Sequence, residues 1–494
     1  MVEENKREQM LLEFAKQMNN LISNNFVNGQ KKNYFSTKFS HEKITTYLSN
    51  PAKYEKELRN MSIVLSTMSS QYSQIVNYFG DIALIKAVIT PNASKYVDAK
   101  SGEVKDKDKL IKDYLNATTL LQLMKLEHTF KNILKVMARE DVYYGYIHKT
   151  NTSFYIQKLD PDYCQIRYIQ EGCFGFTIDM SYFDKNNTLA NIEGTLIETY
   201  PLEIQQAYKL YLKDKKKYKY FEPELKNTVC FKYNESLDFN FPPFANLYDE
   251  ISRLEDYKAL ALNKTTIDNY KLIGMKIPLL NADREDALAI STDMAMLFYN
   301  MLVNCLPEGV GAFITPTDFD DISFSNASSS DRKEVSDAED NVYSDSGISP
   351  VVFGKDANSS TGLKTSNLVD SAKLFTLYRQ FERWLNFYFG VEFKEKFNVK
   401  LLDVTIHTID EEVERLYKLA TMGVPVKLQL CTLLQSQAEE RGSLLLEKVL
   451  GLAEDWLPLN SSFVQTGSEG GRPTESDVTE SGEKSRANED NIDR

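Results

Sequence analysis

The stretch 347–367 contains the residue types of a phosphate-binding loop. Gly354, Gly362, Lys364 and Thr365 resemble the pattern G-x-x-x-x-G-K-[ST], in which backbone amides and a lysine hold nucleotide phosphates. The spacing differs, because seven residues separate the two glycines and a leucine stands directly before the lysine. The lysine would therefore not leave the turn toward the β- and γ-phosphates, and the sequence does not predict a nucleotide site here.

Cysteine and histidine, the residues of most metal and nucleophilic sites, are few and scattered. The nine residues are Cys164, Cys173, Cys230, Cys305, Cys431, His41, His128, His148 and His407. No C-x-x-C pair occurs among them, and their dispersed, odd cysteine set fits reduced thiols better than disulfides or zinc ligands. The motifs G-x-S-x-G and H-E-x-x-H are also missing from the sequence. We therefore expect no enzymatic activity, no metal and no cofactor.

The chain of 494 residues is acidic. Lys and Arg number 58 against 71 Asp and Glu, which gives a formal net charge of -13 and a pI near 5.1. This charge disfavours a general nucleic-acid binder. The composition, with 26% charged and 42% hydrophobic residues, is that of a globular protein. The length suggests about two to four domains.

Targeting segments are not evident in the sequence. The N-terminal run MVEENKREQMLLEF mixes acids with bases and lacks the apolar core of a signal peptide. No run approaches the ~18 consecutive apolar residues that are needed to span a bilayer. We therefore expect a soluble, intracellular protein.

Helical periodicity dominates the first part of the chain. Apolar residues recur every three to four positions over residues 1–60 and again over 58–91, where Pro91 is expected to end the helix. The same periodicity predicts a helix for LEHTFKNILKVMARE, Leu126–Glu140.

Residues 141–234 have the composition of a β-rich segment. Short runs of Tyr, Phe, Ile and Thr are separated by turn formers. The predicted strands are VYYGYIHK, SFYIQKL, CQIRYI, FGFTIDMSYF and TVCFKYN, with turns at DPDY and EGCFG. Between the last two strands lies a basic run that contains Lys209, Lys213, Lys215, Lys216, Lys217 and Lys219. This run could bind phosphate groups or form a solvated face.

The second half of the chain alternates long helices with small elements. A helix is predicted over about 246–270, followed by a compact unit of a strand (275–280), a helix (283–306) and a second strand (309–316). The next segment, 317–347, carries nine acids and two bases, so deep burial is not expected.

A long amphipathic helix is predicted over 365–389, at the end of the polar stretch 347–367. A helical hairpin then follows. Thr408 and Glu411 have capping-box spacing, Gly423 is expected to end the first helix, and Pro425 suits the first turn of the second.

This order of elements resembles that of the portal proteins, or head-to-tail connectors, of tailed bacteriophages. The stretches that carry the resemblance are LRNMSIVLSTMSSQYSQIVNYF, MKIPLL with GVGAFITP, GISPVVFG, and LYKLATMGVPVKLQL. The resemblance implies a mixed α+β, predominantly helical portal-type fold with wing, stem, clip and crown regions. The implied regions are an N-terminal helical region (1–45), the α/β wing (46–245), a stem helix (246–274), the clip (275–316), an acidic segment with the second stem helix (317–347), the tunnel loop (348–364), a long helix that returns to the wing (365–408), crown helices (409–460) and a disordered acidic tail (461–494).

The resemblance also implies a function. A portal protein forms a homo-oligomeric ring, typically of twelve subunits, at one capsid vertex, and viral DNA is packaged and ejected through its channel. The implied partners are the terminase large subunit, the major capsid protein, a head-completion or adaptor protein and the double-stranded DNA in the channel, with no membrane. The implied location is the virion, and the host cytoplasm during assembly.

The resemblance assigns site residues as well. The DNA-facing tunnel loop would include Lys355, Asn358, Ser359, Ser360 and Lys364. The clip would include Lys276, Asp283, Arg284, Glu285 and Glu308. An acidic channel suits DNA that slides, because contacts that neutralise many phosphates hold DNA tightly. Two other classes stay open: another oligomeric phage structural protein, from the capsid or tail, and a nucleic-acid-processing enzyme.

Overall fold

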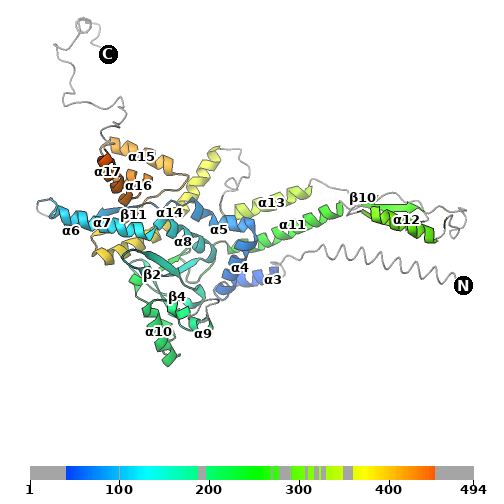
Figure 1. The fold of residues 1–494 in the computed structure, drawn as a ribbon, viewed down its shortest axis with the longest axis horizontal. Helices are drawn as coiled ribbons and strands as arrows, with labels where there is room; N and C mark the ends of the chain where they lie inside the picture. Colours follow the sequence, from blue (N-terminus) through cyan, green and yellow to red (C-terminus); the bar gives the residue numbers. More distant parts are fainter. Residues whose placement is uncertain are drawn as a thin grey trace, which may run out of the picture. The chain divides into compact units, whose positions relative to one another are not determined.

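The fold is mixed α/β and mainly helical, as the sequence predicts (Figure 1). The computed structural model describes residues 40–98, 101–186, 196–268, 271–276, 290, 292–305, 310–315, 322–323, 330–348 and 360–450. The chain divides into two compact units, Met1–Ala438 and Glu439–Arg494, and the elements below belong to the first unit unless the second is named.

Helices form most of the described chain. The α-helices are α3 His41–Ser49, α4 Glu55–Met68, α5 Ser70–Ile82, α6 Ala93–Tyr96, α7 Lys107–Met124, α8 Leu126–Glu140, α9 Tyr182–Asn186, α10 Leu202–Lys213, α11 Tyr248–Asp268, α12 Thr292–Cys305, α13 Ser330–Asp345, α14 Ser360–Phe393, α15 Ile409–Thr421, α16 Lys427–Leu434 and α17 Gln437–Leu450, the last of which runs into the second unit. Short 3-10 turns are η1 Pro161–Tyr163, η2 Leu196–Thr199, η3 Leu225–Asn227 and η4 Ala245–Leu247.

The described strands form four small sheets. The strands are β1 Ala87–Pro91, β2 Val142–Lys149, β3 Phe154–Lys158, β4 Cys164–Gln170, β5 Cys173–Asp179, β6 Tyr220–Phe221, β7 Thr228–Lys232, β8 Lys271–Lys276, β9 Val310–Thr315, β10 Ile322–Ser323 and β11 Phe397–Leu401. Their orders are β1–β11, β3–β2–β7, β4–β5–β6 and β10–β8–β9, and every pair is antiparallel except β8 with β9.

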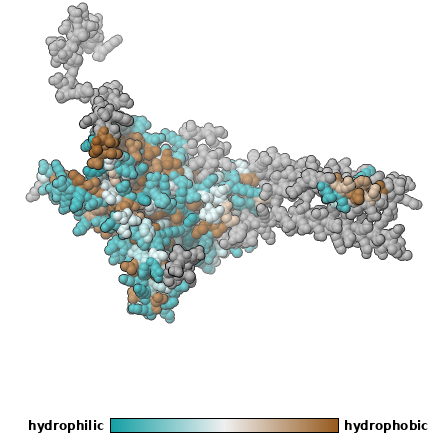
Figure 2. All heavy atoms as spheres, in the orientation of Figure 1, coloured by the Kyte–Doolittle hydropathy of each residue, from teal (hydrophilic) through white to brown (hydrophobic). Residues whose placement is uncertain are grey.

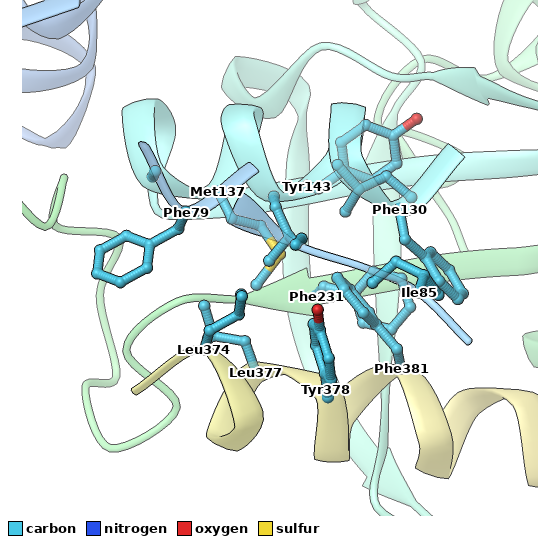
Figure 3. Close-up of a cluster of buried hydrophobic side chains, with 14 of the residues drawn as sticks. Phe79, Ile85, Phe130, Met137, Tyr143, Phe231, Leu374, Leu377, Tyr378 and Phe381 are labelled. Carbon is cyan, nitrogen blue, oxygen red and sulfur yellow. The ribbon is translucent and has the colours of Figure 1, made fainter. Parts of the chain in front are cut away.

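The larger core lies where α8 and α14 meet the β3–β2–β7 sheet. Phe130 of α8 and Phe381 of α14 stack with ring centroids 4.3 Å apart, and Phe231 of β7 meets the Phe381 ring edge-on at 4.7 Å (Figure 3). All three rings are buried. Such aromatic contacts add to the large apolar area that each ring removes from water. They fix the long helix α14 against elements more than 140 residues earlier in the sequence.

A second core lies against the β4–β5–β6 sheet. Phe176 of β5, Phe183 of α9, and Ile204 and Tyr208 of α10 are buried together there. The turn between β4 and β5 uses Gly172 at φ 75°, a conformation that glycine adopts at little cost. This core supports α10, which is not among the predicted elements.

The segment from α11 to α13 forms a small unit joined to the larger core by two helices. α11 leads into β8, α12 connects β8 to the parallel strand β9, and β10 pairs with the other edge of β8. α13 then packs along α11, and the pair lies side by side in Figure 1. A parallel strand pair needs such a crossover helix between its strands.

Two of the predicted elements differ from the structure. The block 58–91 is two helices and a strand rather than one helix: Ser69 breaks it by capping α5, where its hydroxyl accepts from the Tyr72 amide, and Pro91 ends β1. The strand expected at 275–280 is β8, which begins earlier, at Lys271, next to the range predicted to be helix. Residues 277–280 lie outside the described part.

The helical hairpin has the expected order but different caps. The Thr408 hydroxyl makes no cap to α15 and accepts instead from the Thr405 amide at 2.9 Å, so the capping-box prediction is wrong. Gly423, at φ 86°, follows the first helix as predicted. Pro425 lies two residues before the start of α16 rather than in its first turn.

Other predictions hold or fall outside the described chain. The helix Leu126–Glu140 matches α8 residue for residue, and Phe130, Ile133, Leu134 and Met137 are all buried on one face. The predicted strands of 141–234 correspond to β2, β3, β4, β5 and β7. Residues 1–39 of the predicted N-terminal helical region and the whole tail 461–494 lie outside the described residues.

Candidate functional site

The predicted channel loop is described only at its two ends. Lys355, Asn358 and Ser359 lie outside the described residues. Ser360 and Lys364 do not lie in a loop, because α14 already begins at Ser360. This is a correction to the predicted boundary of 348–364, and it places these two residues in the first turns of the long helix.

Lys364 has a specific partner on the hairpin helix α15. Its Nζ lies 2.5 Å from a carboxylate oxygen of Glu411, and both side chains are exposed. The hydrogen bond and charge of Glu411 raise the pKa of Lys364. Glu411 thus pairs across two helices instead of capping its own helix. A lysine held in this way is less available for DNA than one in an open loop.

The start of the predicted loop is anchored to α14. Gly347, at φ 71°, follows the end of α13, and its carbonyl oxygen accepts from the Lys373 ammonium at 2.7 Å. Ile348, the next residue, is buried. Gly347 is therefore bound to α14 through Lys373, and the segment 349–359 leads into the first residue of α14, Ser360.

The two helices proposed by the resemblance as stem, α11 and α13, meet through acidic side chains. Glu250 of α11 and Asp345 of α13 interact directly, and desolvation together with this neighbouring carboxyl raises the pKa of Glu250 to about 7. Arg253 of α11 offsets part of this repulsion, and Lys258 of α11 forms a separate ion pair with Glu339 of α13 at 3.5 Å. Gln71 of α5 also donates to Glu339, so α13 is tied to the larger core as well.

One face of α12 carries exposed hydrophobic side chains. Leu297, Phe298 and Met301, here called the α12 stripe, are 45 to 58% exposed. Figure 2 shows hydrophobic residues on the surface where α12 lies. Asp293 is the only charged residue among the fourteen residues of this helix. A surface helix with so little charge and such large apolar groups in water is typical of a contact surface.

The second unit has an apolar surface of its own on α17. Its exposed side chains are Leu444, Leu445, Leu446, Val449 and Leu450. Acidic and basic residues lie on the same helix, among them Glu439, Glu440 and Lys448. The helix is therefore amphipathic with its apolar side in solvent.

Of the five predicted clip residues, Lys276 is the one that the structure describes. Asp283, Arg284, Glu285 and Glu308 lie outside the described residues. Lys276 is the last residue of β8, and its side chain is exposed. The α12 stripe, which no sequence pattern singles out, lies in the same region.

A buried charged cluster is not evident from the sequence. Asp141 and Lys232 are buried next to each other, and Gln380 of α14 bonds to both the backbone amide and the carbonyl of Lys232. The only local signal in the sequence is Lys232 at the end of an otherwise apolar strand.

Within the described residues, no three His, Cys, Asp or Glu side chains are grouped to hold a metal ion, and no helix there is long and apolar enough to span a membrane.

No protein-family model matches the chain, and no curated protein matches it either. Among solved structures, the chain is similar to one in the structure described as "Neck of empty GTA particle computed with C6 symmetry". The identity is 11% and the TM-score 0.41, over 74% of this chain and 90% of the other. At this TM-score the likeness does not assign the fold.

Proposed function

We propose that this chain is the subunit of a portal ring in a tailed-phage particle, a structural protein rather than an enzyme. The observation that carries the proposal is the path of the chain from α11 to α13. The chain leaves the larger core along α11, builds the small unit of β8, α12, β9 and β10, and returns along α13, which packs on α11. This path fits a clip held at the end of a two-helix stem.

The rest of the chain fits the same plan. The two cores around β2 and β5 would form the wing, and α14 would return to it after the tunnel loop. The hairpin of α15 and α16, with α17, would form the crown. The wing would contact the major capsid protein, and the clip would contact the terminase large subunit during packaging and a head-completion or adaptor protein later.

The α12 stripe supports assembly into a ring. Three large apolar groups in water are costly, and burying an apolar group contributes about 25 cal/mol per Å² of surface removed. A neighbouring copy of the chain is the partner that a symmetric assembly supplies at every subunit. In the proposed ring, the stripe packs against the clip of the next subunit.

The acidic charge supports passage of DNA rather than tight binding. The chain carries 58 basic and 71 acidic residues, and the acidic segment 317–347 lies next to the proposed channel loop. Contacts that neutralise many phosphates release counterions and hold DNA strongly. An acidic channel wall lacks such neutralising contacts, so double-stranded DNA can slide along it.

Mass photometry of the purified chain tests the proposal. At micromolar concentration we expect one dominant oligomer, with a mass near twelve subunits, in the absence of other viral proteins. A population made only of monomers would count heavily against a portal. An extended tube or lattice would favour another phage structural protein, and ATP turnover by the isolated chain would favour an enzyme.

A further inference from the structure

A strongly basic surface lies at the end of α10 and in the turn that follows it. We call this surface, residues 209–219, the lysine tip. It contains six lysines and one acid, Asp214. The lysines are Lys209, Lys213, Lys215, Lys216, Lys217 and Lys219, and all except the half-buried Lys219 are exposed. Figure 2 shows hydrophilic residues at this end of α10 with hydrophobic ones among them, and Leu210 and Leu212 are exposed there.

The tip is an ordered structure rather than a loose run of lysines. The Asp214 carboxylate accepts from the backbone amides of Lys216 and Lys217 at 3.1 and 3.0 Å, which closes the turn after α10. The helix itself rests on the second core through buried Tyr208 and Tyr211. The only acid of the tip is therefore used to hold the backbone that presents the lysines.

Ion pairs account for only two of the six lysines. Lys215 pairs with Asp184 at 2.8 Å, and Lys219 pairs with Asp179 at 3.3 Å. Within the part of the chain that the structure describes, no ion pair involves the remaining four lysines, which are Lys209, Lys213, Lys216 and Lys217. These four point charges remain for an external anion.

Aromatic rings accompany the lysines. Lys217 lies 5.1 Å from the centre of the Tyr218 ring, and Lys219 lies 5.0 Å from the centre of the Tyr220 ring. The Arg167 guanidinium of β4 lies 5.6 Å from the same Tyr220 ring, which is half exposed. Cations over ring faces are held near one place, which lowers the entropy cost when they meet a ligand.

We infer that the lysine tip is a contact site for the phosphate backbone of nucleic acid, separate from the proposed channel residues. The inference rests on the proposed function, because packaged DNA is the polyanion that such a particle would contain. Four ammonium groups suit a row of phosphates, since lysine contacts phosphates as a point charge without reading sequence. The overall charge of -13 makes a local basic surface necessary for such a contact.

An acidic protein segment is a less suitable partner. Duplex DNA carries about one negative charge per 1.7 Å of its axis and releases condensed counterions when lysines neutralise its phosphates, a gain that a protein segment of lower charge density does not supply. The four lysines also lie on an exposed helix end and turn, in contrast to the partly enclosed sites where carboxylate pairs are strong.

A salt-dependent binding measurement with the full-length assembled protein tests the inference. The probe is a fluorescein-labelled DNA duplex of random sequence, about 30 base pairs long, followed by anisotropy between roughly 50 and 200 mM NaCl. The variant replaces Lys209, Lys213, Lys216 and Lys217 with glutamine and leaves the ion-paired Lys215 and Lys219 in place. At about 100 mM NaCl we expect the affinity to fall by about tenfold or more. The slope of log K against log salt should shrink by roughly 0.9 for each phosphate that the variant no longer neutralises.

A matched control makes the result specific. Lys105, just before α7, and Lys107, Lys109 and Lys112 in its first turns are also exposed but alternate with Asp106, Asp108 and Asp113. The Lys→Gln variant at these four positions changes the net charge by the same amount, and we expect it to bind the duplex like the wild type. Equal losses of affinity in both variants, or an unchanged affinity in the tip variant, would overturn the inference. If poly-glutamate displaced the labelled duplex as well as unlabelled DNA does, the lysine tip would be a general anion-binding surface, and the inference of a nucleic-acid site would be wrong.

The test of the lysine tip can fail or succeed independently of the test of the portal proposal. Mass photometry of each variant reports ring formation independently of DNA binding, and circular dichroism reports folding. A ring that forms normally but does not bind the duplex would reject the lysine tip and leave the portal proposal standing. Duplex binding through the tip by a protein that forms no ring would reject the portal and keep the nucleic-acid site.

Discussion

Asp141 and Lys232 form a buried charged pair, with Oδ2 and Nζ 3.9 Å apart and exposed fractions of 0% and 2%. The Asp141 carboxylate accepts from the amides of Asn234 and Phe241, each at 3.0 Å. The Lys232 ammonium donates to the carbonyl of Phe239 at 2.8 Å and to that of Leu237. The pair thus holds the segment that leads from β7 toward α11, the proposed stem. Removing one partner of such a pair leaves a buried charge that nothing offsets.

Asp141 is expected to make stability depend on pH. Burial raises the pKa of this carboxyl from 3.8 to about 7, against the opposing effect of Lys232. The folded protein therefore binds the proton more tightly than the unfolded chain, so the unfolding free energy should fall as pH rises from about 4 to about 7. Asp141→Asn should flatten this dependence in thermal melts followed by circular dichroism.

The same substitution should also destabilise the protein, by about 1–3 kcal/mol, because one amide NH2 must face a backbone N–H. Asp141 has φ 69° and ψ -40°, and asparagine has the same branching near the backbone, so a difference in backbone strain is not the cause. Asp238→Asn, in the exposed part of the same connecting segment, is the control and should melt like the wild type at every pH. Unchanged pH dependence in Asp141→Asn would remove Asp141 as its source.

The α12 stripe should control self-association. Leu297→Glu together with Met301→Glu would place two charges in the proposed subunit contact, where each unpaired buried charge is costly. We expect the subunit contact to weaken by about 2–4 kcal/mol, typical of central interface residues, and rings to give way to monomers in mass photometry. Ile111→Glu with Leu115→Glu, at exposed positions one turn apart on α7, is the matched control. Rings that survive the α12 change as well as the control would exclude this face from the interface.

The C-terminal tail should be dispensable for assembly. Residues 461–494 are rich in Ser, Gly, Glu, Asp and Asn and offer little apolar surface to bury. Deleting them should leave the mass of the assembly, corrected for the missing residues, and its melting temperature unchanged. Failure of the truncated chain to form rings would show that the tail takes part in the subunit contact.

The lysines of the predicted channel loop should act on DNA rather than on the fold. Lys355→Ala with Lys364→Ala should leave melting temperature and ring mass nearly unchanged, because an exposed ion pair such as that of Lys364 with Glu411 contributes only about 0–1 kcal/mol to stability. Packaging or retention of DNA in assembled particles should change. Glu411→Gln serves as the control, since it breaks the pair with Lys364 but keeps the lysine. Normal packaging in the double variant would remove the case for these lysines as DNA contacts.

Elements with strong local periodicity can be predicted from the sequence. The prediction for α8 is right residue for residue, because its apolar positions recur at one helical face and its ends coincide with the pattern. The break at Ser69 escapes prediction because apolar periodicity continues on both sides of it. β1 looks helical in the sequence because its partner, β11, lies more than 300 residues later, with Ala87 opposite Leu401. Local sequence carries no information on such a pairing.

Contacts between distant residues explain why parts of the candidate site escape prediction. The sequence places Lys364 in a loop because its helix begins in a polar, small-residue stretch, and its ion pair with Glu411 joins two separate helices. The charged pair of Asp141 and Lys232 depends on the antiparallel register of β2 and β7. From the sequence, α12 looks like an ordinary core helix. Composition alone does not distinguish apolar side chains that face the core from those that face solvent, as the α12 stripe does.

Negative-stain electron microscopy of the purified full-length chain tests the central proposal most directly. The portal proposal predicts closed rings with a central hole, about twelve-fold symmetry and a narrow extension where α11, α12 and α13 would gather. Monomers, tubes or flat lattices under conditions in which the chain is folded by circular dichroism would contradict it.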